Sequence, residues 1–356
     1  MKAQRVKKRK IASTHKIGWG IIGSGSFADH TFAPAIKEAK GAELLSVLAP
    51  SRFEAEEFCR RHKIKGAHYN LAEFLADKAT KAIWIAAPTH MHKEFAIAAL
   101  KAGKHVLCEK PMAVTTTDCR AMITAAKRAR RKLHIAYNTR HHPKIQGIQK
   151  DWISGRFGKP VHGRCHLYYP YSRDVGHRTL GRIRGWHSSD GKVGGWAYGD
   201  VGTHLIDQLR WFLGDAKKLI GSHNTSPTWG YKTPDHAVAM IAFKNGSVGT
   251  ISASTGLTPG KGRLEFYGDD GYIIIEGGLL GEEGSLTTGV TNFRKTKSGH
   301  GTTRTAKEKT TILSAINTYR LQVEAFGDTI ARGRSYPLTP EDGLANIKLI
   351  SAARGW

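Results

Sequence analysis

The residues from Ile17 to Ala28 read IGWGIIGSGSFA, and this stretch decides the fold. A short apolar run is followed by a G-x-G-x-x-A turn and then by a helix-like segment. In such a turn the first glycine permits the tight bend, the second lets a ligand approach the backbone, and the small third residue lets the helix pack closely. The free N–H groups at the helix start favour an anion such as a pyrophosphate. We therefore expect a dinucleotide to be bound by Gly23, Gly25, Ser26, Phe27 and Ala28.

The first third of the chain alternates short apolar runs with helix-like stretches. The pattern predicts strands at residues 17–22, 43–48, 82–87, 105–108 and 133–137, and helices near 27–39, 53–62, 91–102 and 115–131. Such alternation is typical of βαβ units that form a parallel sheet with both faces covered. We expect a disordered basic tail at residues 1–15 and a doubly wound Rossmann dinucleotide-binding domain at residues 16–138.

After residue 139 the pattern changes to that of a second α/β domain, residues 139–356, with a large, open, mostly antiparallel sheet. Strands are predicted at 216–222, 236–244, 247–255, 262–268 and 271–276, and helices near 143–154, 200–213, 313–332 and 340–353. The last helices can pack back on the first domain. Residues 284–312 are rich in Gly, Thr and Lys and are expected to form a long exposed loop.

The charge of the chain is strongly positive. Its 356 residues carry a formal net charge of +26, and the first sixteen hold seven Lys or Arg and no acid. A second basic run spans residues 127–132. No nucleic-acid-binding motif accompanies this charge, so we expect a solvated tail and helix end and no nucleic-acid partner.

Other classes of protein are disfavoured by composition. No run approaches the ~18 apolar residues of a membrane span, so we expect no membrane partner. The four cysteines are scattered, which argues against a disulfide scaffold and against a zinc ribbon. The histidines are dispersed as well, and we expect no metal site.

The end of the second predicted strand bears on the choice of cofactor. An acid near this position usually accepts a hydrogen bond from the ribose 2′-OH of NAD. Here Ser51 and Arg52 offer a hydroxyl and a guanidinium, which suit a 2′-phosphate. We therefore expect NADP to be preferred, with NAD as the alternative cofactor.

Four further motifs indicate a family resemblance. AGKHVLCEKP occupies residues 102–111, GGWAYGDVGTHLIDQLRWFLG occupies 194–214, and PTHMH and YNTR occupy 88–92 and 137–140. Together with the Gly-rich turn they resemble the Gfo/Idh/MocA oxidoreductases over nearly the whole chain. The resemblance implies hydride transfer between NAD(P) and a sugar, cyclitol or related polyol, and an oligomer formed through the second sheet. It also implies that the cofactor is contacted by Pro88, His92, Glu109 and Lys110, and the substrate by Lys110, Arg140, Trp186, Asp200 and His204.

The chemistry of the predicted catalytic residues agrees with this resemblance. Asp200 and His204 are four residues apart at the start of a predicted helix and so share one face. Removing a hydride from an alcohol needs a base for the hydroxyl proton, which suits His204. It also needs a positive charge beside the developing oxyanion, which suits Lys110. Asp200 can orient either the hydroxyl or the imidazole.

Alternatives to a simple dehydrogenase or reductase remain on the same fold. Some proteins similar to this family use transient oxidation to assist glycoside hydrolysis, and others sense nucleotides without catalysis. A pure sensor needs no proton-transfer group, so Lys110, Asp200 and His204 favour an enzyme. We expect a cytoplasmic homo-oligomer, a dimer or tetramer.

Overall fold

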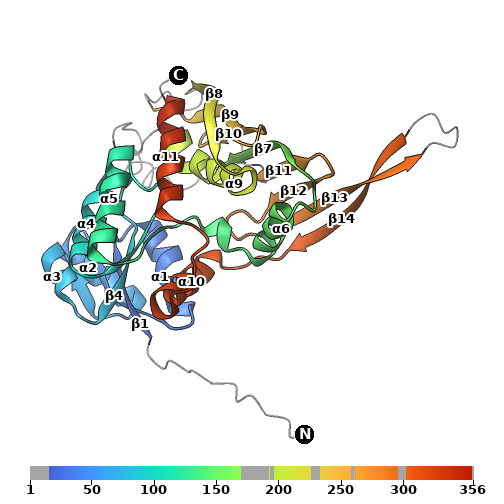
Figure 1. The fold of residues 1–356 in the computed structure, drawn as a ribbon. Helices are drawn as coiled ribbons and strands as arrows, with labels where there is room; N and C mark the ends of the chain where they lie inside the picture. The colour runs from blue at the N-terminus through green and yellow to red at the C-terminus, as the bar shows by residue number, and fades with distance from the viewer. Residues whose placement is uncertain are drawn as a thin grey trace, which may run out of the picture.

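The computed structural model describes residues 16–169, 192, 196–225, 233–257, 260, 262–295 and 302–354. These residues form a six-stranded sheet and an eight-stranded sheet with helices packed against both (Figure 1). The first sheet is parallel throughout and the second is mostly antiparallel, which confirms the predicted fold class. The expected tail at residues 1–15 lies outside the described residues.

The first sheet has the strand order of a dinucleotide-binding domain. Its strands are β1 (Ile17–Ile22), β2 (Ala42–Leu48), β3 (Gly66–His68), β4 (Thr80–Ile85), β5 (His105–Cys108) and β6 (Leu133–Ile135). They lie in the order β3-β2-β1-β4-β5-β6. Successive strands are added to one side of β1 as far as β3, and from β4 onward they are added to its other side. Ligands of open α/β sheets bind in the crevice at the carboxyl ends of the strands beside such a switch point. The Gly-rich turn follows β1 at this position.

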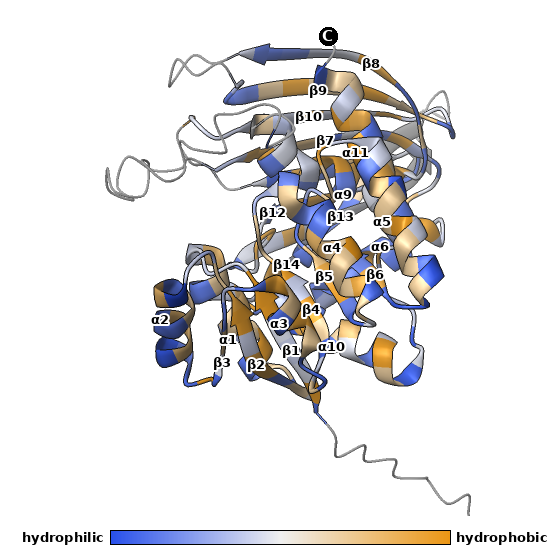
Figure 2. Ribbon diagram, turned by 90° about the vertical axis from the view of Figure 1, so that its left-hand side faces the viewer, coloured by the Kyte–Doolittle hydropathy of each residue, from blue (hydrophilic) through white to orange (hydrophobic). Residues whose placement is uncertain are grey.

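Helices cover both faces of this sheet. They are η1 (Ala28–Phe32), α1 (Ala33–Glu38), α2 (Arg52–His62), α3 (Leu71–Ala76), η2 (Thr89–Met91), α4 (His92–Lys101), α5 (Thr116–Ala129) and η3 (Asn138–His141). Trp19, Ile83 and Leu107 are fully buried, as expected for parallel strands enclosed on both sides. Figure 2 shows the apolar colour concentrated in β4 and β5. The short β3 and α3 were not predicted, because a three-residue strand leaves no apolar run to detect.

The second sheet contains a central strand that the sequence pattern did not reveal. Its strands are β7 (Pro160–Tyr168), β8 (Ala216–Thr225), β9 (His236–Phe243), β10 (Val248–Ser254), β11 (Arg263–Gly268), β12 (Gly271–Gly277), β13 (Gly284–Lys295) and β14 (Thr302–Leu313). Their order is β14-β13-β12-β11-β7-β10-β9-β8. The unpredicted β7 pairs in parallel with β10 and antiparallel with β11. Its outward face is polar, with His162, Arg164 and His166, so it lacks the apolar run of a predicted strand.

The remaining helices connect the two sheets. They are α6 (Pro143–Ile153), η4 (Trp196–Gly202), α9 (Thr203–Leu213), α10 (Thr318–Arg332) and α11 (Pro340–Arg354). Helix α9 packs on β7, β10 and β11. Helix α10 packs on α1, and α11 packs on both α5 and α9. The last two helices therefore return to the first sheet, as Figure 1 shows.

Residues 284–295 and 302–312 form most of a long β-hairpin, and the prediction of an exposed loop was wrong for them. Strands β13 and β14 are antiparallel, and their pairing begins with Gly284 opposite Leu313. From there the two strands extend away from the body of the protein (Figure 1). Residues 305–310 are all exposed, so no alternation of apolar and polar residues marks the strand. The β-branched threonines nevertheless favour extended backbone. Because β14 continues to Leu313, α10 starts only at Thr318, where the side chain of Asn317 caps it.

Buried histidines predict a loss of stability in mild acid. Burial lowers the pKa of His134 to about 4 and that of His141 to about 3, against ~6.5 in an unfolded chain. Between pH 6.5 and about 4 the unfolded chain therefore binds more protons than the native protein, so the free energy of unfolding falls as the pH falls. We expect a lower melting temperature at pH 5 than at pH 7, with a smaller difference in His141→Gln. The exposed His30→Gln serves as the control; equal pH dependence in all three proteins would contradict this account.

Candidate active site

The Gly-rich turn lies at the carboxyl edge of the first sheet, between β1 and β4. Gly23 has a φ of +111°, and a Cβ there would lie 2.6 Å from the carbonyl oxygen of Ala86, so only glycine fits. A Cβ on Gly25 would meet nothing within 4 Å, which leaves this part of the backbone open to a ligand. Ser26 and Phe27 are exposed, whereas Ala28 is buried against the sheet. The turn thus has the cradle shape that a pyrophosphate requires.

The residues expected to read the 2′ position of the cofactor lie at the start of α2. The Ser51 hydroxyl accepts a hydrogen bond from Glu54 N at 3.2 Å and caps the helix, so its own proton remains available to a ligand. Arg52 donates from Nη2 to the Tyr69 hydroxyl at 2.6 Å, and its guanidinium lies 5.0 Å from the centre of the Tyr69 ring. Tyr69 follows β3 and was not predicted, because β3 itself was not predicted. It holds the exposed Arg52 side chain in one direction.

The buried side chain of His92 holds the loop after β4 in place. Pro88 precedes η2, and the buried His92 begins α4. The two ring nitrogens of His92 lie 3.0 Å from the carbonyl oxygen of Pro111 and 2.9 Å from that of Ala87. Burial lowers the pKa of His92 to about 4, so the ring is neutral and donates a hydrogen bond to one of these two carbonyl oxygens while packing beside the other. The predicted direct contact between His92 and the cofactor is corrected here, because both ring nitrogens face the protein backbone.

Glu109 and Lys110 follow β5 at the same edge. Glu109 accepts hydrogen bonds from Trp84 Nε1 at 3.1 Å and from the Lys110 backbone N at 3.2 Å. Burial raises the pKa of Glu109 to about 7, although the positive charge of Lys110 opposes this rise. Lys110 Nζ lies 2.5 Å from Asp200 Oδ1 and 3.0 Å from the Asp200 carbonyl oxygen. A loop of the first sheet and η4 of the second domain therefore meet through this ion pair.

His204 lies in the first turn of α9, one turn beyond Asp200. Burial lowers the pKa of His204 to about 3, with a further contribution from the positive charge of Lys110, while Asp200 acts in the opposite direction. Lys110 and Asp200 are paired directly, and the charges of both act on the buried imidazole of His204. The ring meets the edge of Tyr137, with 6.1 Å between centroids and an interplanar angle of 88°. At neutral pH the imidazole is uncharged and able to accept a proton.

Two residues that were predicted to contact the substrate, Arg140 and Trp186, are not placed at the site by the described part of the structure. Arg140 is only 4 % exposed and forms a bidentate ion pair with the buried Asp207, at 2.8 Å for both hydrogen bonds. Its guanidinium is satisfied inside the protein, so the predicted contact of Arg140 with substrate is corrected. Trp186 lies outside the described residues.

The structure adds Tyr319 of α10 to the neighbourhood of this site. Its ring lies 5.7 Å from that of Phe32 and 6.5 Å from that of Trp84. Burial raises the pKa of Tyr319, with further contributions from Glu109 and Asp200, so its hydroxyl stays protonated. No spacing in the sequence connects this helix with the motifs near residues 110 and 200, and only the fold brings it here.

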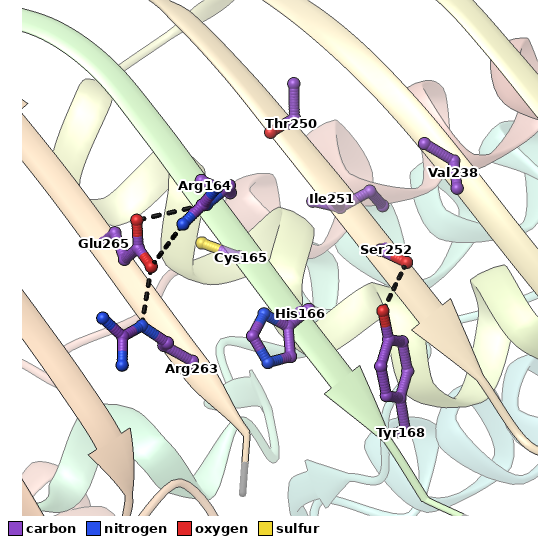
Figure 3. A pocket seen from close by; sticks show the side chains of 10 residues that line it. All are labelled: Arg164, Cys165, His166, Tyr168, Val238, Thr250, Ile251, Ser252, Arg263 and Glu265. Atoms are coloured by element: carbon purple, nitrogen blue, oxygen red, sulfur yellow. Dashed lines mark hydrogen bonds and ion pairs between the residues drawn. The ribbon is translucent and has the colours of Figure 1, made fainter. Parts of the chain in front are cut away.

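A separate pocket of about 380 Å³ lies on the face of the second sheet that faces away from α9 (Figure 3). Glu265 is held between Arg164 at 2.9 Å and Arg263 at 2.6 Å, and these hydrogen bonds keep its pKa at about 2 although burial alone would raise it. The Tyr168 hydroxyl lies 3.1 Å from Ser252 Oγ. None of the predicted catalytic residues lines this pocket. Among the described residues, no group of three or more His, Cys, Asp or Glu could hold a metal ion.

The contact between Trp84 and Glu109 gives a test that is independent of activity. As the pH rises through about 7, Glu109 ionises and the indole N–H donates to a carboxylate instead of a neutral acid. We expect the tryptophan emission of the wild-type protein to contain a component that titrates with a midpoint near this value. This component should be absent from both Trp84→Phe and Glu109→Gln. Its persistence in Glu109→Gln would show that another group titrates.

Comparisons with known proteins agree with this geometry. The family described as "Oxidoreductase family, NAD-binding Rossmann fold" matches residues 17–137, and the "GFO/IDH/MocA C-terminal domain" matches residues 148–274. The chain is 25% identical to 1,5-anhydro-D-fructose reductase of Ensifer adhaerens, over 92% of each chain. It is 24% identical to scyllo-inositol 2-dehydrogenase (NAD(+)) of Bacillus subtilis (strain 168), over 95% of this chain and 93% of the relative.

A solved structure shows the same fold. The 3-ketoreductase from Actinomadura kijaniata in complex with NADP superposes with a TM-score of 0.76 and 18% identity, over 96% of this chain and 97% of that one. None of the helices in the described ranges is both long and apolar enough to cross a membrane. The two family matches cover most of both domains, and the Gly-rich turn and the Lys110–Asp200 pair lie within them. The chain belongs to the Gfo/Idh/MocA family of NAD(P)-binding oxidoreductases.

Proposed function

We propose that this protein transfers a hydride between NADP(H) and a sugar, cyclitol or related polyol. One observation carries the proposal: the Lys110–Asp200 ion pair, whose charges act on the neutral His204, follows β5 at the carboxyl edge that also presents the Gly-rich turn. The names of the two relatives add support, since one is a reductase of an anhydrosugar derivative and the other a dehydrogenase of a cyclitol. A screen of sugars and cyclitols with NAD⁺ and NADP⁺ in parallel tests the substrate class; no turnover with any of them would contradict it.

The residues at the carboxyl edge fit a nicotinamide dinucleotide. Gly23 permits the tight turn and Gly25 offers open backbone to the pyrophosphate. Ser51 and Arg52 offer a hydroxyl proton and a guanidinium to a 2′-phosphate. When bound, the nicotinamide ring supplies the site that accepts or donates the hydride. We propose NADP as the preferred form because the Tyr69 hydroxyl and ring hold the positively charged guanidinium of Arg52 at this position.

In this proposal the protein contributes two things: His204 exchanges a proton with the substrate hydroxyl, and Lys110 provides a positive charge beside it. In alcohol oxidation, the neutral imidazole of His204 accepts the hydroxyl proton. Lys110 lies beside it and stabilises the negative charge that develops on the same oxygen. Asp200 holds the Lys110 ammonium through both its carboxylate and its carbonyl oxygen. Its negative charge favours the imidazolium and so opposes the lowering of the His204 pKa by burial and by Lys110.

The oligomeric state and location are parts of the same proposal. Val238 and Met240 of β9 and Ile220 of β8 are 40 %, 42 % and 39 % exposed. Exposed apolar side chains gathered on one open sheet support a homo-oligomer formed through this face. The four cysteines are free and buried, which accords with a reducing compartment, and we propose a cytoplasmic location. Sedimentation of wild type and Met240→Lys tests the interface.

The cofactor preference predicts the effect of a single substitution. Arg52→Ala removes the guanidinium expected to bind the 2′-phosphate, and a charged hydrogen bond of this kind contributes ~1.5–3 kcal/mol. We expect NADPH affinity to fall roughly 10- to 100-fold, as that energy implies, and NADH affinity to remain unchanged. Tyr69→Phe, which keeps the ring but removes the hydroxyl, should give a smaller effect in the same direction. Tighter binding of NADH than of NADPH by the wild type in a fluorescence titration would contradict the preference.

The catalytic assignment predicts large losses of rate without loss of fold. Lys110→Ala and His204→Ala should each lower kcat by ~10²-fold or more, the usual effect of removing a positioned acid–base group. Both variants should stay folded and still bind NADPH, because the proposed cofactor contacts at the Gly-rich turn, Ser51 and Arg52 are left in place. Lys93→Ala, which removes a surface ion pair with Asp118, is a matched control. Near-normal kcat in His204→Ala would require another base.

A further inference from the structure

A buried polar network joins the end of the first sheet to the helix that carries His204. Arg140 in η3 donates from Nε to Asp207 Oδ2 and from Nη2 to Asp207 Oδ1, each at 2.8 Å. Asn346 of α11 donates to the same carboxylate, with 3.0 Å between Nδ2 and Oδ1. The Arg140 and Asp207 side chains are only 4% and 0% exposed. Solvent and salt therefore screen this ion pair weakly.

A second contact holds the same helix on the other side of His204. The hydroxyl of Tyr137, which follows β6, lies 2.6 Å from Thr203 Oγ1, and both groups are buried. Thr203 immediately precedes His204, and Asp207 follows it by three residues, close to one helical turn. The ring of Tyr137 also meets the imidazole edge-on. Helix α9 is thus attached to Tyr137 and η3, the segment that follows the last strand of the first sheet, both before and after His204.

We propose that Tyr137, Arg140 and Asp207 are positioning residues that hold His204 at reacting distance from the oxygen bound by Lys110. This inference rests on the proposed roles of His204 and Lys110. The planar guanidinium fork of Arg140 fixes both the position and the rotation of its partner, which a lysine cannot do. Misplacement of a reacting group by about 1 Å can lower a rate by ~10²-fold, so a helix attachment of this kind bears directly on catalysis.

A purely structural role makes a different prediction. The cost of desolvating two buried charges offsets much of their attraction, so replacing both partners with apolar residues of similar volume is often nearly neutral for stability. The double variant Arg140→Met, Asp207→Leu therefore separates the two roles. If the pair only stabilises the fold, a folded double variant has wild-type activity. If the pair positions α9, the folded double variant has a low kcat.

The first experiment measures the chemical step in folded protein. Tyr137→Phe, Arg140→Lys and the double variant are compared with wild type for kcat, KM and NADPH affinity, with the primary isotope effect measured using NADPH deuterated at both C4 positions. We expect kcat to fall about tenfold or more, within the range for misplaced reacting groups. The isotope effect on kcat should increase, and NADPH affinity should be unchanged. A reduced fraction of active protein would leave the isotope effect unchanged, so that result would overturn the proposal.

The second experiment does not depend on turnover. The imidazole Cε1–Hε1 resonance of His204, assigned by its absence in His204→Asn, is compared among the same variants by NMR. It should shift in Tyr137→Phe and Arg140→Lys but not in Arg156→Lys, which alters an exposed ion pair with Asp151. An unchanged His204 resonance in the first two variants would overturn the proposal. Absence of turnover in the wild type would contradict the proposed function instead, and the NMR comparison would still decide the positioning role.

Discussion

The ion pair between Lys110 and Asp200 is the interaction on which the rest of the site depends. The two residues come from different sheets, yet Nζ and Oδ1 are only 2.5 Å apart. Each side chain is 17% exposed, so solvent screens their attraction less than at an open surface. The pair places a fixed positive charge at the carboxyl edge of the parallel sheet, where the Gly-rich turn of a dinucleotide site also lies. The proposed chemistry depends on this contact between a loop of the first sheet and η4.

Burial shifts the pKa values of the histidine and of the carboxyl near that charge in opposite directions. It disfavours the charged form of each group, so the pKa of His204 falls to about 3 and that of Glu109 rises to about 7. The imidazole is neutral and the carboxyl lies near its midpoint at physiological pH, while the guanidinium of Arg140 stays charged because Asp207 faces it. The same physical effect keeps the His204 imidazole neutral and lowers stability in acid through His134 and His141.

The sequence predicted the parts of the fold that have local signals. The turn after β1 and the buried strands of the first sheet are visible as glycines and apolar runs, and Lys110, Asp200 and His204 stand in recognisable motifs. Arg140 also stands in a motif, but its partner Asp207 is distant in the sequence, so its burial could not be predicted. Strand β14 has no apolar face, and its extended form depends on pairing with β13. Tyr319 joins the site only because α10 returns to the first sheet.

The central claim is that one substrate oxygen binds between Lys110 and His204. A crystal structure of the ternary complex with NADP⁺ and a polyol tests it most directly. The account predicts one polyol oxygen within hydrogen-bond distance of both Lys110 Nζ and a ring nitrogen of His204. A polyol bound elsewhere, for example in the sheet pocket beside Arg164 and Glu265, with Lys110 still paired only to Asp200, would contradict it.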